Sequence, residues 1–382
     1  MAISFDSSLS ITNTTTENPD KAADVLNGHT ILEAIPVVTH LLDGGWLGKI
    51  GSTVILLFGT FGNVMTVTIL RRLRSGWSAM NVYLTALALS DTAMLYSGTL
   101  PMWARKMLDY DVYASHVAVC KVVIWVMNSS AALSAWLLVA LTAQRAASVV
   151  WPHRVNVICT HHKSVVSIVV ITCVCSLLYS HTLYGFELVD MGNGTTRRCT
   201  FGSADYQGFY VSVWVRVDML IYSVLPCACL IVSNSLLGWK LTVAMRDAKE
   251  KFSAGSGDQR DRRQKKASSV TVTIITVSAA FVLITVPLTT YNTFFFGYAS
   301  SDIDYFLYDF FFIFGMTNFA WNFYLYCLSG SRFREEFKNI MFGCRAPVVS
   351  LAEPVCVTEE SHVSEIKKRG SEERVTETND DF

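Results

Sequence analysis

Charged residues are scarce in this chain. They make up 16% of its 382 residues, whereas a soluble domain averages about 25%. Lys plus Arg and Asp plus Glu both number 31, so the formal net charge is zero. A neutral total gives no reason to expect a nucleic-acid partner, which would require a basic surface. Hydrophobic residues reach 51%, and this excludes disorder over most of the length, because disordered chains combine low hydrophobicity with high net charge.

Long apolar runs, by contrast, are plentiful. A helix that crosses a membrane needs about 20 mostly apolar residues. Short polar loops separate the runs, which argues against the alternative of core helices in a large soluble protein. The sequence therefore predicts an all-α membrane protein, a seven-transmembrane helix bundle. The predicted spans are 47–70, 80–103, 117–144, 164–186, 209–239, 268–296 and 303–328.

The domain organisation follows from these spans. Phe333 and Phe337 recur at helical spacing among charged residues after the last span, which is typical of a helix in the membrane interface. The tail beyond it is polar and rich in Ser and Thr, as disordered segments are. We expect an extracellular glycosylated segment at 1–46, the seven-helix domain at 47–328, an amphipathic interfacial helix at 329–345 and a disordered cytoplasmic tail at 346–382.

Basic residues indicate the orientation in the membrane, because Lys and Arg concentrate in cytoplasmic loops. Here they cluster after span one, between spans five and six and after span seven, for example at Arg71, Lys251 and Arg334. We therefore predict a multi-pass protein of the plasma membrane with an extracellular N-terminus, a cytoplasmic C-terminus and the lipid bilayer as a partner. The neutral total becomes a cancellation between basic inner segments and acidic outer segments.

This orientation predicts several covalent modifications. Asn13 and Asn193 begin Asn-x-Thr sequons in outer segments and are candidate glycosylation sites. Cys344 follows the interfacial helix and is a candidate for palmitoylation, with an unmodified thiol as the open alternative. Of the ten cysteines, Cys120 and Cys199 are the two that face the oxidising exterior. This predicts a disulfide between them.

Polar groups inside a membrane are costly and mark functional sites by default. Asp91 lies in the middle of span two, and Arg145 closes span three. A carboxylate among hydroxyl and amide oxygens could hold a sodium ion, while the alternative is a hydrogen-bonded network with water and no ion. We expect no other metal or cofactor. The polar groups at similar depth are Asn63, Ser134, Asn318 and Asn322.

An ordered set of motifs runs through the spans. The motifs are Gly62-Asn63, LALSD ending at Asp91, Cys120 with Arg145, Pro226, Phe281 with Pro287, and Asn322 with Tyr326. In this order and spacing they resemble the rhodopsin-like (class A) G-protein-coupled receptors, over about residues 47–345. Trp103 and the stretch SAMNVYLTALALSD look most like invertebrate neuropeptide receptors of the FMRFamide and thyrotropin-releasing-hormone type.

The resemblance implies a receptor that passes ligand binding to a heterotrimeric G protein and is not an enzyme. It also implies that a phosphorylated Ser/Thr-rich tail could bind arrestin. The residues at coupling and switch positions would be Gln144, Arg145, Pro226, Phe281, Pro287 and Tyr326.

Three positions depart from the family pattern. Gln144 stands where an acid usually pairs with the arginine, Thr285 replaces a Trp, and Phe323 replaces a Pro. Because Gln144 supplies no charge opposite Arg145, we hypothesise raised basal activity. A non-signalling (decoy) peptide-binding receptor is the nearest alternative. A polytopic transporter is a more distant one, since no internal repeat of the kind found in many transporters is present.

Two residues that the spans lack argue against amine and retinal ligands. Met127 stands where receptors for amines carry an Asp, and span seven has no Lys for retinal. Outer acids and aromatic residues suit a peptide with a basic residue, through cation–π and charge-assisted contacts. The alternative is an ordinary interfacial belt of aromatic residues. The candidate ligand contacts are Trp103, Met127, Glu187, Asp218, Tyr291, Phe295 and Asp309.

Overall fold

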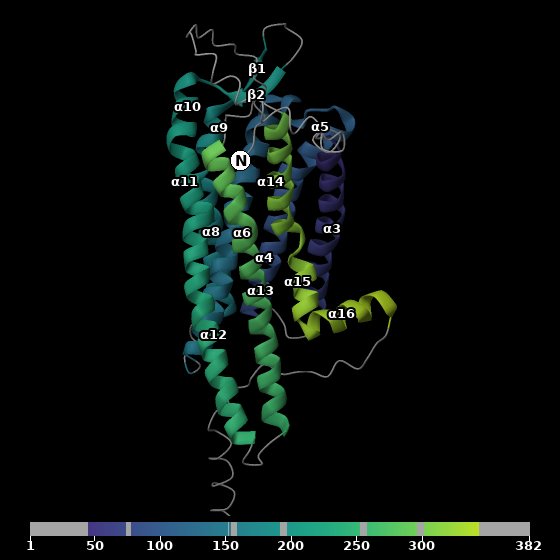
Figure 1. The fold of residues 1–382 in the computed structure, drawn as a ribbon, viewed down its shortest axis with the longest axis vertical. Helices are drawn as coiled ribbons and strands as arrows, with labels where there is room; N and C mark the ends of the chain where they lie inside the picture. The colour runs from purple at the N-terminus through teal and green to yellow at the C-terminus, as the bar shows by residue number, and fades with distance from the viewer. Residues whose placement is uncertain are drawn as a thin grey trace, which may run out of the picture. The chain divides into compact units, whose positions relative to one another are not determined.

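The computed structural model describes residues 45–73, 78–151, 153, 159–191, 197–252, 258–295 and 302–343. The predicted modification sites Asn13, Asn193 and Cys344 lie outside these residues, as does the tail from 346 to 382. The described residues form a helical bundle with one small β-hairpin (Figure 1).

Seven helical segments run through the described residues, in the order that the apolar runs predict. The first four are built from α3 (Gly45–Arg72); α4 (Ala79–Met94), the π-turn η1 (Leu95–Thr99) and α5 (Leu100–Leu108); α6 (Val117–Val150); and α8 (His161–Leu178) with the short α9 (His181–Gly185). A 3-10 turn, η2 (Val112–Ala114), lies between α5 and α6.

Helix α6 in segment three runs past its predicted end at 144, to Val150. Of the remaining segments, five and six are longer than their apolar runs. Helix α12 extends past 239 and α13 begins before 268, because charged residues that form helices well continue them. Segments five to seven are α10 (Ala204–Phe209), η4 (Tyr210–Trp214), α11 (Val215–Met219), η5 (Leu220–Val224) and α12 (Leu225–Phe252); α13 (Asp258–Phe295); and α14 (Asp302–Ala320) with α15 (Asn322–Ser329). The predicted amphipathic helix is formed as α16 (Ser331–Phe342).

Five of the described helices are long and apolar enough to cross a membrane by length and composition alone. Segment two is not among them, and its buried face carries the polar residues Asn81, Ser90 and Asp91. Segment seven contributes a shorter apolar helix, Phe306–Ala320. The five are Trp46–Arg72, Val117–Val150, His161–Gly185, Ala204–Lys240 and Thr271–Phe294.

Helix α6 is the central element, and it packs against α4, α8 and α12. Polar side chains bridge these contacts. The Ser90 hydroxyl in α4 donates to the Ser130 carbonyl of α6 at 2.9 Å. The Trp125 indole nitrogen donates to the Ser176 carbonyl of α8, also at 2.9 Å.

Three π-turns, η1, η4 and η5, widen segments two and five locally, because their hydrogen bonds span five residues instead of four. In η1 and η5, an aromatic side chain from elsewhere donates to a carbonyl of the turn. Tyr113 donates its hydroxyl to Ser97 O in η1 at 2.9 Å. Trp136 of α6 donates its indole nitrogen to Ile221 O in η5 at 3.1 Å. These bonds tie the widened turns to their neighbours.

A two-stranded hairpin closes one end of the bundle, and α16 lies at the opposite end (Figure 1). We call these the hairpin end and the α16 end. Strand β1 (Phe186–Asp190) pairs antiparallel with β2 (Arg197–Phe201), with Leu188 opposite Cys199. The hairpin was not predicted. The span predicted at 164–186 ends at Gly185, and Phe186 begins β1. The rings of Phe186 and Phe201 pack together across the hairpin, with their centroids 5.0 Å apart.

The predicted disulfide between Cys120 and Cys199 is confirmed, with their Cα atoms 5.6 Å apart. It joins the beginning of α6 to β2, and both cysteines are buried in a cluster of aromatic residues. The hairpin is therefore fixed covalently over the bundle.

Segment seven is interrupted although it has no proline. Helix α14 ends at Ala320 and α15 begins at Asn322, with Trp321 between them at φ −97°. Phe323 packs edge-on against Phe61 of α3, with ring centroids 6.1 Å apart. Gly62 permits this approach, because a Cβ there would lie only 3.0 Å from the Phe323 Cβ.

Candidate functional site

A pocket lies among segments two, three, five, six and seven, toward the hairpin end. Its lining is mostly apolar and aromatic, so it suits a ligand with hydrophobic groups. Asp218 is the one carboxylate among the lining residues. They are Met94, Ala131, Tyr210, Val215, Asp218, Met219, Tyr222, Leu288, Thr289, Asn292, Thr293, Phe312 and Met316.

Asp218 is held by Tyr179, which follows α8. The Tyr179 hydroxyl donates to Asp218 Oδ1 at 2.5 Å. The Tyr179 ring packs edge-on against Trp214, with centroids 5.5 Å apart and planes at 88°. Arg216, two residues before Asp218, is exposed, and its guanidinium lies against Ser212 O of its own segment. The carboxylate therefore has a neutral donor from the protein.

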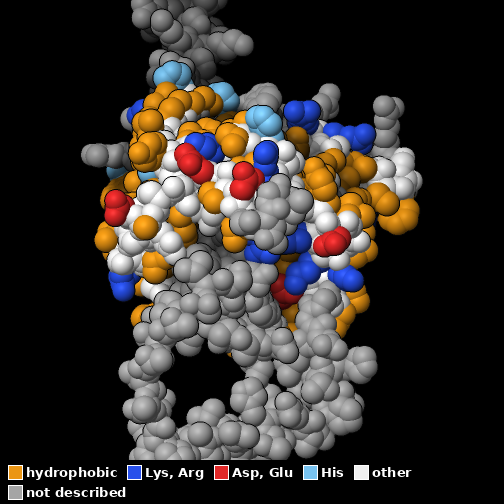
Figure 2. Space-filling model, turned by 90° about the horizontal axis from the view of Figure 1, so that it is seen from above, with side chains coloured by type: hydrophobic (Ala, Val, Ile, Leu, Met, Phe, Trp, Pro, Cys, Tyr) orange, Lys and Arg blue, Asp and Glu red, His pale blue; other side chains and the backbone are white. Residues whose placement is uncertain are grey.

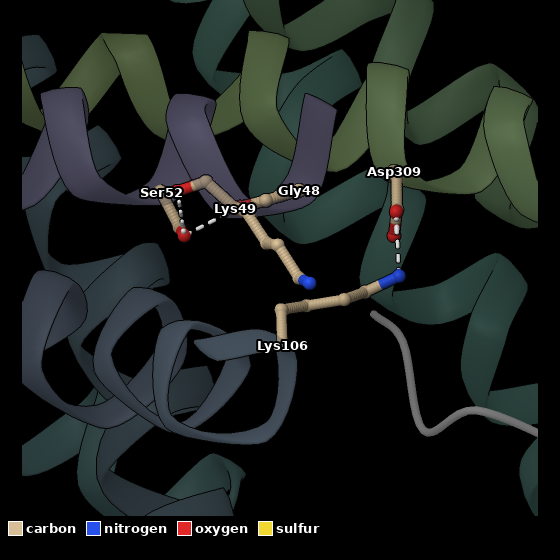
Figure 3. A network of polar contacts seen from close by, with 5 residues as sticks. All are labelled: Gly48, Lys49, Ser52, Lys106 and Asp309. Atoms are coloured by element: carbon tan, nitrogen blue, oxygen red, sulfur yellow. Dashed lines mark hydrogen bonds and ion pairs between the residues drawn. The ribbon is translucent and has the colours of Figure 1, made fainter. Parts of the chain in front are cut away.

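Asp309, another predicted ligand contact, is already paired. Lys106 of α5 reaches Asp309 of α14, with Nζ 2.7 Å from Oδ2 (Figure 3). The Asp309 side chain is 4% exposed. Helix α3 comes close at Gly48, where a Cβ would lie 3.0 Å from the same carboxylate oxygen. This ion pair joins segments two and seven beside α3. Asp309 does not line the pocket.

Three more predicted ligand contacts have their side chains engaged by other residues of the protein, outside the pocket lining. Glu187 Oε1 on the hairpin lies 3.8 Å from Lys121 Nζ. Trp103 donates its indole nitrogen to Thr53 Oγ1 at 2.9 Å. Tyr291 stacks on Phe311 with ring centroids 4.7 Å apart. None of the three lines the pocket.

Met127 and Phe295 complete the predicted ligand contacts. Met127 is buried, and its sulfur lies 3.7 Å from the Tyr113 hydroxyl. The side chain of Phe295 lies outside the described residues. Asp218 is thus the predicted contact that the structure places in the pocket lining. At the hairpin end, seen from above in Figure 2, Lys and Arg side chains lie among Asp and Glu.

A polar centre lies deeper in the bundle around Asp91, which is fully buried. Asp91 Oδ1 accepts a hydrogen bond from the Ser134 hydroxyl at 2.6 Å. Oδ2 accepts one from Asn322 Nδ2 at 2.7 Å. Asn63 instead donates to Phe319 O at 3.1 Å, and Asn318 is buried near them. Three of the five predicted network residues therefore meet directly.

These contacts bear on the predicted sodium ion. Both Asp91 oxygens already accept hydrogen bonds. Sodium would need oxygen ligands, so the Asn322 amide would have to present its oxygen instead of its nitrogen; amide orientation is assigned from such networks. The described residues include no cluster of three His, Cys, Asp or Glu side chains suited to a metal. The arrangement fits a hydrogen-bonded network, and sodium binding stays a prediction.

The predicted switch residues lie toward the α16 end. The Arg145 guanidinium contacts the Met80 sulfur of α4. Gln144 donates its amide nitrogen to Ser164 of α8 at 3.4 Å. Its buried side-chain oxygen has no hydrogen-bond partner in the described part of the chain. Gln144 therefore contacts the fourth segment and does not balance the charge of Arg145.

The other switch positions are buried between segments or lie within them. Phe281 of α13 packs edge-on against Tyr222, with ring centroids 6.4 Å apart. The ring of Tyr326 in α15 packs against that of Phe333 in α16, with their centroids 5.3 Å apart. Pro226 lies in the first turn of α12, and Pro287 lies inside α13.

Two residues of the site were missed by sequence reasoning. Tyr179 falls within an apolar run, where a tyrosine is typical of a membrane belt. Tyr222 lines the pocket and also contacts Phe281. Their roles depend on which segments become neighbours, and periodicity within one run does not contain that information.

Comparison with known proteins gives consistent matches. Residues 62–326 match the family described as 7 transmembrane receptor (rhodopsin family). Growth hormone secretagogue receptor type 1 of Rattus norvegicus is 27% identical over 249 residues, covering 63% of this chain and 65% of that receptor. The receptor of the same name from Homo sapiens is 28% identical over 203 residues, covering 51% and 54%.

A second kind of relative is more distant. Cholecystokinin receptor type A of Rattus norvegicus is 25% identical over 210 residues, covering 53% of this chain and 46% of that receptor. This chain therefore spans 65% of the length of the rat secretagogue receptor and less than half of the cholecystokinin receptor.

Proposed function

The chain belongs to the rhodopsin family of 7 transmembrane receptors, and we propose that it is a receptor for an extracellular neuropeptide that acts on a heterotrimeric G protein. The family consists of signalling receptors of the plasma membrane. The names of the similar receptors, for a growth hormone secretagogue and for cholecystokinin, support the peptide class. The finer likeness to FMRFamide and thyrotropin-releasing-hormone receptors is part of the same proposal.

The observation that carries the proposal is the pocket beneath a hairpin held by a disulfide. Disulfides persist in oxidising compartments, so the Cys120–Cys199 bond supports an extracellular hairpin end. An N-terminus outside and a C-terminus inside follow from that orientation. The pocket would then be reached from the extracellular side, where a secreted peptide arrives.

A route from the pocket toward the α16 end is built into segments five and six. Tyr222 lines the pocket and contacts Phe281 of α13. Further along α13, the Ser278 hydroxyl lies 3.4 Å from that of Thr142 in α6, and both are fully buried. A peptide that prefers one arrangement of Tyr222 would shift the population of states in which α13 leaves α6. The G protein would bind the surface around Arg145 that this movement opens.

Some features favour a second candidate function, a decoy receptor that binds peptide without coupling. Gln144 leaves Arg145 without an adjacent acid, and Thr285 and Phe323 replace residues of the usual switch. Arrestin binding to a phosphorylated tail is a separate proposal, and that tail lies outside the described residues.

A peptide-library screen tests these alternatives. Cells expressing the full chain are exposed to amidated neuropeptides while calcium and cyclic AMP are read together. We expect at least one peptide to give a response that is absent from untransfected cells. Surface binding of a labelled peptide with neither response would favour the decoy. Accumulation of a small solute would contradict the receptor assignment and favour a transporter.

A further inference from the structure

Three outer acids among the described residues are paired with cations of the protein. Asp309 is buried against Lys106. Glu187 faces Lys121, and Asp190 pairs with Arg197 at 3.0 Å. Each of these carboxylates has a cation from the protein itself, and none lines the pocket.

Asp218 differs from them in its partners. Within the described residues, Lys and Arg side chains form ion pairs with Asp309, Glu187 and Asp190 and none with Asp218. Its Oδ1 accepts a hydrogen bond from the neutral Tyr179 hydroxyl. A carboxylate offers about four acceptor positions on two oxygens, so capacity for further donors faces the pocket.

The surroundings make a carboxylate without a Lys or Arg partner among the described residues costly. Asp218 lies in a membrane-spanning segment, among apolar and aromatic side chains such as Met219, Tyr210 and Tyr222. An ionised group in such a place is expensive unless it is paired. The two tyrosine rings provide π faces that attract a cation as well.

The geometry points to Asp218 as the counter-ion for a cationic group of the ligand, of the amidinium, guanidinium or ammonium class. This inference rests on the proposed function for the identity of the ligand as a peptide, and it names the part of the peptide that must enter the pocket. A peptide with an accessible arginine, lysine or free amino terminus satisfies it. A purely acidic or neutral peptide does not.

A pair of isosteric fragments tests the charge directly. Benzamidine is a flat aromatic cation, and benzamide is its neutral counterpart of nearly the same shape. The full chain is purified in lipid nanodiscs, and its melting temperature is followed as each fragment is titrated. We expect benzamidine to raise the melting temperature in a saturable way and benzamide to have no effect at the same concentrations.

Variants then locate the site. Asp218→Asn keeps the shape and removes the charge, and it should weaken benzamidine binding at least about tenfold, as expected for a lost charge-assisted hydrogen bond. Asp190→Asn is the matched control at an outer acid away from the pocket and should bind benzamidine as the unmodified chain does. Asp218→Glu retains the charge and should still prefer benzamidine over benzamide.

The outcomes separate this inference from the proposed function. Equal responses to the two fragments in the unmodified chain, or no response to benzamidine, would overturn the inference without any variant being needed. Equal affinity of Asp218→Asn and the unmodified chain would overturn it as well. Benzamidine binding at Asp218 without any G-protein response to peptides would leave the inference standing and contradict the signalling function.

Discussion

The hydroxyl of Tyr179 donates a 2.5 Å hydrogen bond to Asp218, and so joins segment four to the wall of the pocket in segment five. Its partners are 39 residues apart in sequence, and both strands of the hairpin lie between them. It fixes the direction of the Asp218 carboxylate.

Tyr179→Phe removes this donor and leaves the ring. We expect it to destabilise the folded chain by about 1–3 kcal/mol, because a hydrogen bond to a buried carboxylate is lost. Tyr184→Phe is the matched control, since Tyr184 is 83% exposed. Thermal melting of both variants in the same nanodiscs makes the comparison, and an equal effect at the two positions would contradict a specific role of Tyr179.

The Cys120–Cys199 disulfide should contribute more to the stability of the folded chain than the Tyr179 hydrogen bond does. Its cysteines are separated by 79 residues, and a native disulfide typically stabilises a protein by about 2–4 kcal/mol. Cys120→Ser with Cys199→Ser should lower the melting temperature and the amount of receptor at the cell surface. Cys173→Ser, at an exposed free cysteine, should leave both unchanged. A double variant as stable as the control would show that the hairpin is held by its aromatic contacts alone.

Lys106 and Asp309 form an ion pair that is suited to a double-mutant cycle. Lys106→Met leaves a buried carboxylate without its cation and should cost about 1–3 kcal/mol. Adding Asp309→Asn removes the unpaired charge, so the double variant should be more stable than Lys106→Met alone. Melting temperatures of the two singles and the double provide the coupling energy. Simple additivity of the singles would contradict an energetic link.

Asp91 satisfies two buried donors, Ser134 and Asn322. Asp91→Ala leaves both without an acceptor and should destabilise the chain by about 2–4 kcal/mol. Asp91→Asn retains one acceptor and should cost less. Melting in sodium chloride or potassium chloride separates the two interpretations of this centre: a rise specific to sodium that Asp91→Asn abolishes would identify a bound ion.

Gln144→Asp supplies the negative charge that Arg145 lacks at this position. We expect lower signalling without ligand, measured as calcium and cyclic AMP in cells with matched surface expression. The reason is that an ion pair would stabilise the state in which Arg145 is retained in the bundle. Gln144→Asn, which adds no charge, serves as the control. Basal signalling of Gln144→Asp no lower than that of the unmodified chain would contradict raised basal activity.

Apolar runs and one pair of outer cysteines were enough to predict the helices and the disulfide. Each helix could be predicted from the apolar residues of its own segment. Cys120 and Cys199 were the two cysteines that the predicted topology placed on the outer side of the membrane. The hairpin was missed because Phe186 continues an apolar run that periodicity alone assigns to a helix. The pairing of Lys106 with Asp309 was missed because segments two and seven lie far apart in sequence. Asp218 was predicted for its charge. Its lack of a Lys or Arg partner among the described residues became visible only in the assembled bundle.

The interruption at Trp321 has a consequence for how segment seven can behave. A proline at this point would break the helix by covalent chemistry, since it lacks an N–H and its ring crowds the preceding turn. Phe323 keeps its N–H, so the break is held by contacts such as those with Phe61 and Phe337. Trp321 N still donates to Thr317 O at 3.0 Å, and Leu325 N donates to Trp321 O at 3.1 Å. The interruption is therefore one residue long and depends on side-chain packing, so the covalent structure of segment seven does not require it.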